Sequence, residues 1–489
     1  MSNLYKIDEN LLSKLQQIIS RYLHDTHNRH RKVVNYQKPE DLKKLFDFDI
    51  STEWVDDDQI LRLIDDIIHY SVANQHPRFF SALRWGASIY SIVGEWLTAV
   101  MGTTMYTYEV APLFTLMEEY MYSKIAISLW RKDNHDGMML PGGATVNLYA
   151  LQLARYALNP EYHQSGMYNT KELVIYTSDQ SHYSITKSAI LMWLGKNNVI
   201  KIVTNEKGEM SVDDLEIKIL QSISMGKQPL LINATSGTTV LWAYDDLELI
   251  WEIAKKYNIW YHVDAIWWWW VLFNDWLRHK MNWIKLADSM WRNPHKMIWA
   301  TIQCSVFMTQ HKDKNLVCNA LKSPYLFNDD KKYDACYDTW DKYVQCGRRV
   351  DVLKLWIQRK ALGDQGISEY VQTAFDNVAY LKSQIDHSDQ LLMAHDPDCL
   401  NVCFWYVPTH LVWKITRETI WEYFDEIHQI TAQIHAQILS HWEMMTMFTT
   451  TKNLPNFFRL AIVSPRVTHE DLDFVVQHIQ ELGLQIENE

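Results

Sequence analysis

Short apolar runs alternate with helix-like stretches from about residue 100 onward, and this alternation restricts the possible folds more than any other feature. Apolar positions at helical spacing occur in segments such as "VNLYALQLARYAL". Between such segments lie the apolar runs "LVIYTS", "VIKIVT", "PLLINATSG", "WYHVDAI" and "CSVFMTQ". Parallel strands need long crossover connections, usually helices, so the pattern predicts a mostly parallel sheet covered by helices. Ligands of such sheets bind at the carboxyl ends of the strands.

The 489 residues are enough for more than one domain. We expect a helical N-terminal arm over residues 1–100, a large domain over 101–360 and a small C-terminal α+β domain over 361–489. The arm contains "ENLLSKLQQIISRYLHDT", which has apolar positions at helical spacing. The C-terminal part joins an amphipathic segment, "ISEYVQTAFDNVAYLKSQI", to the strand-like runs "LNVCFWYVP" and "NFFRLAIVS".

Charge and cysteine usage exclude several classes of protein. The formal net charge of −12 argues against nucleic acid as a partner, because phosphate binding needs clustered Lys and Arg. The N-terminus has no apolar run of signal-peptide length, and Ala265–Phe273 is too short to span a bilayer, so we expect no membrane association. The six cysteines include no CxxC pair, which is typical of reduced thiols in a cytoplasmic protein.

No metal site is expected either. His24, His27 and His30 recur every three residues, a spacing at which two histidines one helical turn apart can bind a metal ion. This segment has no nearby cage of carboxylates, so we favour a solvated helix.

Two residues suggest chemistry on a carbonyl cofactor. Lys296 follows Asn-Pro-His, a turn-prone segment that would present its side chain, and a lysine amine forms a Schiff base when its neighbours lower its pKa. The alternative is a solvated surface lysine. Asp264 ends the apolar run "WYHVD" and needs a partner there, such as the pyridine nitrogen of a cofactor. The alternative is a helix cap or a loop acid.

Two further segments complete the constellation. His182 in "QSHYSITKSA" supplies a planar ring that could stack on a cofactor. In "LPGGATVN", residues 140–147, a Gly-Gly turn opens a helix whose free N–H groups and dipole can receive a phosphate. Each signal is weak when taken alone. Their order along the chain, phosphate turn, stacking histidine, acid and lysine, makes a much more specific pattern.

With these motifs in place, the chain resembles the group II pyridoxal-phosphate decarboxylases that act on glutamate, cysteine sulfinate or aspartate. The resemblance runs from "HPRFF" at His76 to "NFFRL" at Leu460. Its motifs include "YTYEVAPLF", "PGGATVNLYALQLARY", "SHYSITK", "ATSGTTV", "HVDA", "NPHK", "CGRRVD", "KALGDQG" and "NVCFWYVP". The implied fold is α/β, the pyridoxal-phosphate transferase fold (aspartate aminotransferase-like, fold type I), with a small C-terminal α+β domain.

The resemblance implies a role for each matching residue. Lys296 would form the Schiff base with pyridoxal 5'-phosphate, Asp264 would pair with the pyridine nitrogen beside Thr235, and His182 would stack on the ring. The phosphate would be surrounded by Gly143, Ala144, Ser289, Asn293 and His295. Tyr325 would protonate the carbanion from a loop that reaches across a homodimer interface. Arg459 would bind a substrate carboxylate.

Some positions depart from the family pattern. After "HPRFF" the family's Asn-Gln is Ser81-Ala82, so the glutamine contact to substrate is missing at Ala82. Tryptophan stands where the family has glycine or another small residue, which fits 22 tryptophans beside only 15 glycines. These tryptophans are Trp193, Trp242, Trp268, Trp269, Trp270, Trp299 and Trp340. Such changes strain a backbone that needs glycine.

The expected function is the pyridoxal-phosphate-dependent α-decarboxylation of a small acidic L-amino acid to the amine and CO2, by a carboxy-lyase that is a homodimer with its active site at the interface. Cysteine sulfinate, aspartate and glutamate are the expected substrates. The alternatives are an aromatic amino-acid decarboxylase or aminotransferase on the same fold, and a catalytically impaired scaffold caused by the glycine-to-tryptophan changes.

Overall fold

The computed structural model describes residues 9–50, 52–84, 86–127, 129–130, 134–266, 271, 273–274, 277–323, 331–450 and 454–489. The chain forms two compact units. The terminal unit combines Met1–Gly86 with Ala374–Glu489, and the central unit is Ala87–Thr373. The N-terminal residues thus belong to the same unit as the C-terminal ones.

A seven-stranded sheet in the order β1-β7-β6-β5-β4-β2-β3 forms the core of the central unit. Its strands are β1 (Asp136–Leu140), β2 (Leu173–Ser178), β3 (Val199–Ile202), β4 (Gln228–Thr235), β5 (Trp260–Asp264), β6 (Ser289–Arg292) and β7 (Ser305–Thr309). The strands from β3 to β6 pair in parallel, and β7 pairs antiparallel with both β6 and β1. The predicted mostly parallel sheet is confirmed.

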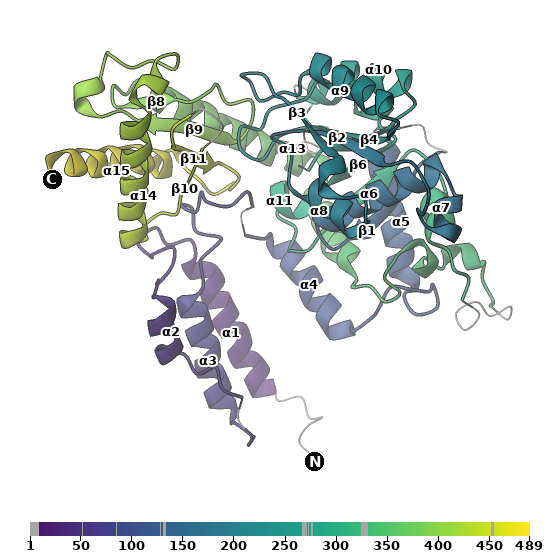
Figure 1. The fold of residues 1–489 in the computed structure, drawn as a ribbon. Helices are drawn as coiled ribbons and strands as arrows, with labels where there is room; N and C mark the ends of the chain where they lie inside the picture. The colour runs from purple at the N-terminus through teal and green to yellow at the C-terminus, as the bar shows by residue number, and fades with distance from the viewer. Residues whose placement is uncertain are drawn as a thin grey trace. The chain divides into compact units, whose positions relative to one another are not determined.

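Helices cover both faces of this sheet, with α9 and α10 on one face and α6 and α8 on the other (Figure 1). The helices are α4 (Ile89–Met101), α5 (Pro112–Ile127), α6 (Gly143–Leu158), α7 (Glu161–Ser165), α8 (Ser184–Leu191), α9 (Val212–Ser224), α10 (Leu247–Lys256), α11 (Pro294–Met297) and α12 (Lys314–Asn319). Helix α13 (Asp351–Asp386) runs from the central into the terminal unit and is interrupted at Gly363, where φ is 62°. Short 3₁₀ helices are η1 (Lys196–Asn198), η3 (Arg278–Met281), η4 (Ile284–Leu286), η5 (Ala335–Tyr337) and η6 (Trp340–Lys342).

Burial explains why the strands read as continuous apolar runs. Every residue of β1, β2, β5, β6 and β7 is buried. A parallel sheet covered on both faces leaves no solvated side, so its strands lack the alternation of apolar and polar residues seen in half-exposed strands. Polar side chains in these strands therefore need partners inside the protein.

The terminal unit contains a four-stranded antiparallel sheet in the order β10-β11-β9-β8. Its strands are β8 (Leu391–Met393), β9 (Asn401–Tyr406), β10 (Met447–Thr449) and β11 (Phe457–Ala461). Its helices are α1 (Glu9–Asp25), α2 (Pro39–Leu45), α3 (Asp57–Tyr70), η7 (Thr409–Leu411), η8 (Ile420–Tyr423), α14 (Phe424–His441) and α15 (His469–Asn488).

An ion pair with a buried carboxylate attaches the N-terminal helices to the rest of the terminal unit. The Arg29 guanidinium donates from Nε and Nη2 to the two carboxylate oxygens of Asp471, at 2.7 and 2.8 Å. The Asp471 side chain is fully buried, and Arg78 Nε lies 3.5 Å from the same carboxylate. Removing one partner of such a pair leaves a buried charge without compensation. Within the described ranges, no helix is both long enough and apolar enough to cross a membrane.

Candidate active site

Lys296 lies in a short helix directly after a strand of the central sheet. β6 ends at Arg292, Asn293 is the N-cap of α11, and Pro294 is its first residue. Proline suits this position because the first helical N–H has no partner within the helix. Lys296 is half-buried, and both of its chain neighbours are buried. This burial does not fit a solvated surface lysine.

Asp264 is the last residue of β5, the parallel neighbour of β6. Its side chain is buried and accepts the Ile266 N–H at 3.3 Å. Burial raises the pKa of Asp264 to about 7, and the nearby Lys296 ammonium, the Ile266 N–H and the Trp291 indole act in the opposite direction. A cation placed beside such a carboxyl favours its ionised form. The carboxyl therefore suits a protonated ring nitrogen.

His182 lies between the end of β2 and the start of α8. Its ring is half-buried, with the Tyr183 ring 4.2 Å away between centroids. Burial, together with the nearby Lys296 and Lys187 ammonium groups, lowers the pKa of His182 to about 4. Lys296 is thus close enough to interact electrostatically with both His182 and Asp264. The structure brings these three predicted residues together at the carboxyl edge of the sheet.

The Gly-Gly turn lies beside the same strands. Gly142 has φ of 93° and ψ of 162° and precedes α6. A Cβ added to Gly143 would lie 1.8 Å from the Trp291 ring, so only glycine fits there. Trp291 pairs in register with Asp264 across β5 and β6. The first turn of α6, at Gly143, therefore packs on β6, the neighbour of the strand that carries Asp264. A helix N-terminus at this place can receive a phosphate.

The remaining predicted cofactor residues lie on the ends and edges of the same strands. Thr235 pairs in register with Asp264, and within the described part of the chain its buried Oγ1 has no hydrogen-bond partner. Asn293 accepts a 2.5 Å hydrogen bond from Ser305, and Nδ1 of His295 is 2.6 Å from the Cys304 carbonyl oxygen.

Ser289 is placed differently from the other phosphate candidates. It starts β6, at the end of the strand away from Lys296. Its hydroxyl bonds to His262 Nδ1 at 2.7 Å and accepts from Trp260 Nε1 at 2.8 Å. The structure therefore does not bring Ser289 to the Gly-Gly turn, because its hydroxyl faces these two partners.

Arg459 and Ala82 both lie in the terminal unit. Arg459 is a buried residue of β11, and one of its terminal nitrogens donates to the Ser81 carbonyl at 3.1 Å and to the Met447 sulfur at 3.1 Å. Ala82 follows Ser81 directly. Burial lowers the pKa of Arg459. A buried guanidinium of this kind is suited to a carboxylate.

Several sequence predictions lie outside the described residues. Tyr325 falls within 324–330, and Trp268, Trp269 and Trp270 fall within 267–270. Of the other predicted glycine positions, three have left-handed backbone: φ is 60° at Trp193, 57° at Trp242 and 54° at Trp299.

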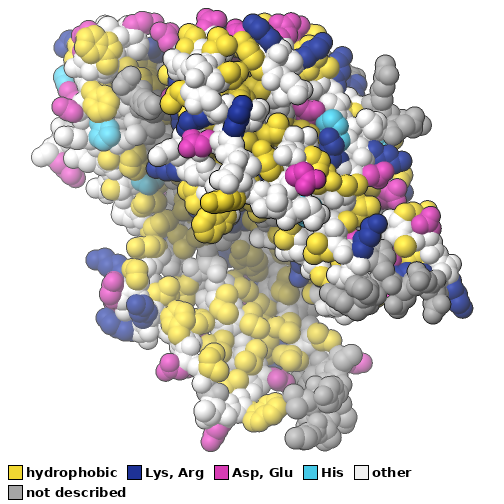
Figure 2. All heavy atoms as spheres, turned by 45° about the vertical axis from the view of Figure 1, so that its right-hand side comes forward, with side chains coloured by type: hydrophobic (Ala, Val, Ile, Leu, Met, Phe, Trp, Pro, Cys, Tyr) yellow, Lys and Arg dark blue, Asp and Glu magenta, His cyan; other side chains and the backbone are white. Residues whose placement is uncertain are grey.

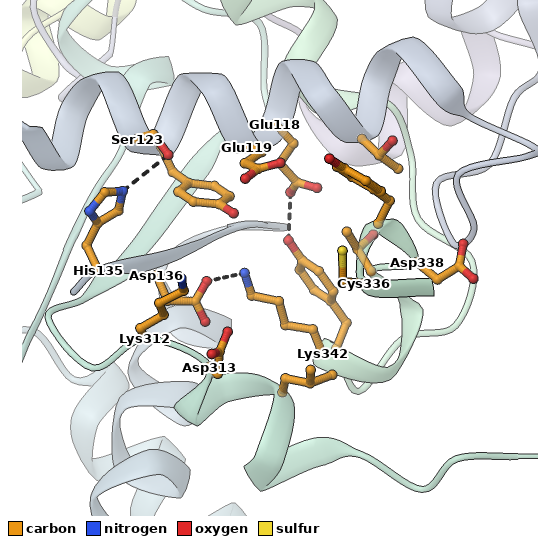
Figure 3. Close-up of a pocket in the computed structure, with 16 residues that line it drawn as sticks. Glu118, Glu119, Ser123, His135, Asp136, Lys312, Asp313, Cys336, Asp338 and Lys342 are labelled. Carbon is orange, nitrogen blue, oxygen red and sulfur yellow. Dashed lines mark hydrogen bonds and ion pairs between the residues drawn. The ribbon is translucent and has the colours of Figure 1, made fainter. Parts of the chain in front are cut away.

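A polar cavity of about 590 Å³ opens at another place in the central unit (Figure 3). In this cavity the Lys342 ammonium pairs with Asp136, and Tyr343 donates to the buried Glu118 carboxylate. Asp136 begins β1, whereas the Gly-Gly turn follows the end of that strand. The cavity therefore lies towards the amino end of β1, and no predicted site residue lines it.

Four further residues around the site were not predicted from the sequence. Trp291 packs on Gly143, and Asn147, Ser184 and His262 form hydrogen bonds between His182 and the sheet. Asn147, Ser184 and His262 lie in the motifs "PGGATVN", "SHYSITK" and "HVDA". Each is a polar residue in a segment that is otherwise apolar or turn-forming. That signal could have identified them.

Comparison with known proteins decides the family. Residues 39–407 match the pyridoxal-dependent decarboxylase conserved domain. The chain belongs to the pyridoxal-dependent decarboxylase family. It is 38% identical to the acidic amino acid decarboxylase GADL1 of Xenopus tropicalis, covering 93% of this chain and 88% of that one. It is also 38% identical to the cysteine sulfinic acid decarboxylase of Mus musculus, covering 92% and 91%.

Solved structures agree with this assignment. The crystal structure of mouse CSAD superposes with a TM-score of 0.93 at 35% identity, covering 97% of this chain and 98% of that one. The predicted family, fold class and carboxy-lyase class are confirmed. For a pyridoxal-dependent decarboxylase, the described residues also fit the cofactor: a half-buried lysine, a buried acid, a histidine ring and a glycine that admits no Cβ converge at one sheet edge.

Proposed function

We propose that this pyridoxal-dependent decarboxylase removes the α-carboxylate of a small acidic L-amino acid, namely cysteine sulfinate, aspartate or glutamate. The observation that carries the proposal is the convergence of Lys296, Asp264 and His182 at the carboxyl edge of the central sheet. The names of the relatives that match over nearly the whole chain, an acidic amino acid decarboxylase and a cysteine sulfinic acid decarboxylase, support the substrate class.

When bound, pyridoxal phosphate supplies an electron sink for the bond that breaks. Lys296 holds the cofactor covalently through its amine. Asp264 holds a proton at the pyridine nitrogen, because a buried carboxylate is stabilised by an adjacent cation. His182 supports the ring plane, and the N-terminus of α6 at Gly143 and Ala144 binds the phosphate. Tyr325 is the proposed proton donor to the α-carbon.

Arg459 is the proposed partner of the substrate's side-chain acid. A planar guanidinium binds a carboxylate or sulfinate through two parallel N–H donors, which a lysine cannot reproduce. Its burial in β11 strengthens such an interaction, because few water molecules compete with the substrate. This chain has Ala82 where the family has a glutamine, so the side-chain amide that would share the acid group is missing and the acid group depends more heavily on Arg459.

A homodimer is the proposed assembly, supported by the surface of the central unit. Hydrophobic side chains gather in several patches on the face shown in Figure 2. Helices α4 and α5 alone expose Ile89, Tyr90, Val93, Trp96, Leu97, Val100, Met101, Leu113, Leu116, Tyr120 and Ile127. Apolar surface of this extent marks an interface. The six cysteines are free thiols, which supports the proposed cytoplasmic location.

A substrate panel tests the activity. The purified protein, supplied with pyridoxal phosphate, is incubated with cysteine sulfinate, aspartate, glutamate and an aromatic amino acid, and amine product is measured. We expect the largest kcat/KM with one of the three acidic substrates, together with a visible absorption band that disappears on borohydride reduction. Faster turnover of the aromatic substrate, or the absence of the band, contradicts the proposal.

A pair of surface variants tests the assembly. Val100→Asp places a charge in the exposed apolar face of α4, where Val100 is 84% exposed. Leu220→Asp is the matched control on α9, where Leu220 is 50% exposed. Light scattering should report a dimer for the wild type and the control, and a smaller mass for Val100→Asp. Equal masses for all three contradict the proposed interface.

The second candidate, an impaired scaffold, is favoured by the backbone of the tryptophans. Trp242 and Trp299 are buried and left-handed, a conformation that L side chains rarely adopt. Trp299 lies three residues after Lys296, and its ring packs at 87° to that of Tyr370. A folded protein that binds no cofactor at saturating concentration would support this reading over the enzyme.

A further inference from the structure

Six residues of the central unit form one continuous, buried hydrogen-bond chain that ends on His182. Every link joins two side chains, and all but the last, between Ser184 and His182, join distant parts of the sequence. In order, the members are Trp260, Ser289, His262, Asn147, Ser184 and His182. They come from β5, β6, α6 and the start of α8, where Ser184 is the first helical residue and His182 lies just before it.

The half of the chain next to His182 has a defined direction. The Ser184 main-chain N–H donates to Nδ1 of His182 at 3.3 Å, so Nδ1 is an acceptor. The Asn147 amide nitrogen donates to Ser184 Oγ at 2.7 Å. Ser184 Oγ accepts that bond, so its own proton is free and the hydroxyl donates it to Nδ1 of His182, 2.8 Å away. The proton of a neutral His182 must therefore be on Nε2.

The half of the chain next to the sheet runs in the same direction. The Asn147 carbonyl oxygen is 3.2 Å from His262 Nε2, which must donate to it. Burial lowers the pKa of His262 to about 3, so this ring is neutral and its Nδ1 is an acceptor. Ser289 donates to that atom at 2.7 Å and itself accepts from Trp260 Nε1 at 2.8 Å.

The four middle members are completely inaccessible to solvent, or nearly so. The relative exposure of Asn147, Ser184, His262 and Ser289 is 0%. Reversing one link would leave two donors facing each other elsewhere in the chain, and a buried polar group without a partner is unfavourable. Because Trp260 Nε1 can only donate, it sets the direction of the whole chain.

We propose that Asn147, His262 and Ser289 are positioning residues that hold His182 in its Nε2–H tautomer and fix the plane of its ring. This inference rests on the proposed function, in which His182 supports the cofactor ring. A histidine fixed in this way presents an N–H, not a lone pair, on the edge of the ring opposite the chain. At other sites, hydrogen-bond partners of this kind fix the tautomer and the ring orientation of a functional histidine. Function there depends on the partner almost as much as on the histidine itself.

Asn147→Asp is the decisive variant, because it changes the hydrogen-bond pattern with almost no change in shape. A carboxylate at this position accepts from both Ser184 and His262. The Ser184 hydroxyl proton is then withdrawn from His182, and Ser184 Oγ becomes free to accept from Nδ1–H. Within the described part of the chain, the long 3.3 Å contact from the Ser184 main-chain N–H is then the one donor left at Nδ1, and the shorter hydroxyl contact at 2.8 Å outweighs it. We expect His182 to lose its Nε2–H tautomer in favour of the Nδ1–H or the doubly protonated form.

The matched control is Asn377→Asp. Asn377 is also a buried asparagine, but it lies in the terminal unit and donates to the Val467 carbonyl. Tautomers are read from ring ¹H–¹⁵N correlation spectra of the cofactor-free protein labelled with ¹⁵N-histidine. The His182 signals are assigned by their loss in His182→Gln. We expect Asn377→Asp to leave them unchanged.

Kinetics provide a second readout. With the best acidic substrate, we expect kcat/KM to fall by roughly tenfold to a hundredfold in Asn147→Asp, and to stay close to the wild-type value in Asn377→Asp. If Asn147→Asp does not fold, Ser184→Ala removes the same hydroxyl donor and should give a mixture of His182 tautomers.

An unchanged Nε2–H tautomer in every folded variant of the chain would overturn the inference. The proposed function fails in a different way: if the wild type makes no product from any acidic substrate, that function is refuted, while the spectra of the cofactor-free protein still test the hydrogen-bond chain.

Discussion

Trp193→Gly should stabilise the protein, because Trp193 occupies a backbone position that is made for glycine. Helix α8 ends in a Schellman motif: Trp193 N–H donates to the Ile190 carbonyl, and Leu194 N–H donates to the Ala189 carbonyl at 2.9 Å. The residue between Met192 and Leu194 must be left-handed in this motif, and Trp193 has φ of 60°. Its side chain is 95% exposed, so its removal loses almost no burial.

The size of the effect follows from two opposing contributions. The left-handed conformation costs a residue with a Cβ roughly 1–2 kcal/mol. Glycine loses roughly 0.5–1 kcal/mol more conformational entropy on folding. The net gain in the free energy of unfolding is therefore about 1 kcal/mol, which corresponds to a rise in Tm of about 2 °C for a unit of this size.

Trp193→Ala is the matched control, because it removes the indole but keeps the Cβ and its strain. Denaturant unfolding followed by circular dichroism, together with thermal melts, should show a clear gain for glycine and a change within about 0.5 kcal/mol for alanine. Equal gains for both variants would refute the reasoning, because they would show that the exposed indole, and not the backbone conformation, is the source of the cost.

Three further predictions concern the site. Lys296→Ala should abolish both the visible cofactor band and turnover. The control Lys187→Ala, which removes the other ammonium near His182, should keep both. Absorption spectra and product assays measure the two effects. In the cofactor-free protein, stability should fall as pH rises from about 4 to about 7, since folded Asp264, with a pKa of about 7, holds a proton that the unfolded chain loses near pH 4. Asp264→Asn should reduce this slope in melts at pH 5 and 7.5, and an unchanged slope would refute the assignment. Arg459→Lys should raise the KM for the acidic substrate at least tenfold, because the bidentate contact is lost. Steady-state kinetics should show a smaller effect on kcat. An unchanged KM would exclude Arg459 as the partner of the carboxylate.

Local pattern in the sequence was enough to predict the class of fold, and the resemblance of its motifs to a known family was enough to predict the family. The run "LVIYTS" is strand β2 from end to end, and "WYHVDAI" contains all of β5 with Asp264 at its carboxyl end. Strands buried on both faces must be apolar throughout, so they are readable without any knowledge of their neighbours. The order of the phosphate turn, the histidine, the acid and the lysine likewise required no coordinates.

Tertiary structure decided which of these residues meet. The pattern of single strands does not reveal that β7 runs antiparallel between β6 and β1, because strand order depends on contacts between distant segments. The family resemblance implied that Ser289 lies at the phosphate, whereas its hydroxyl faces His262, its partner in the register of β5 and β6. The direction of the chain that ends on His182 depends on donors and acceptors contributed by four separate segments. Only packing brings those groups within hydrogen-bonding distance, and burial then allows them a single arrangement of protons.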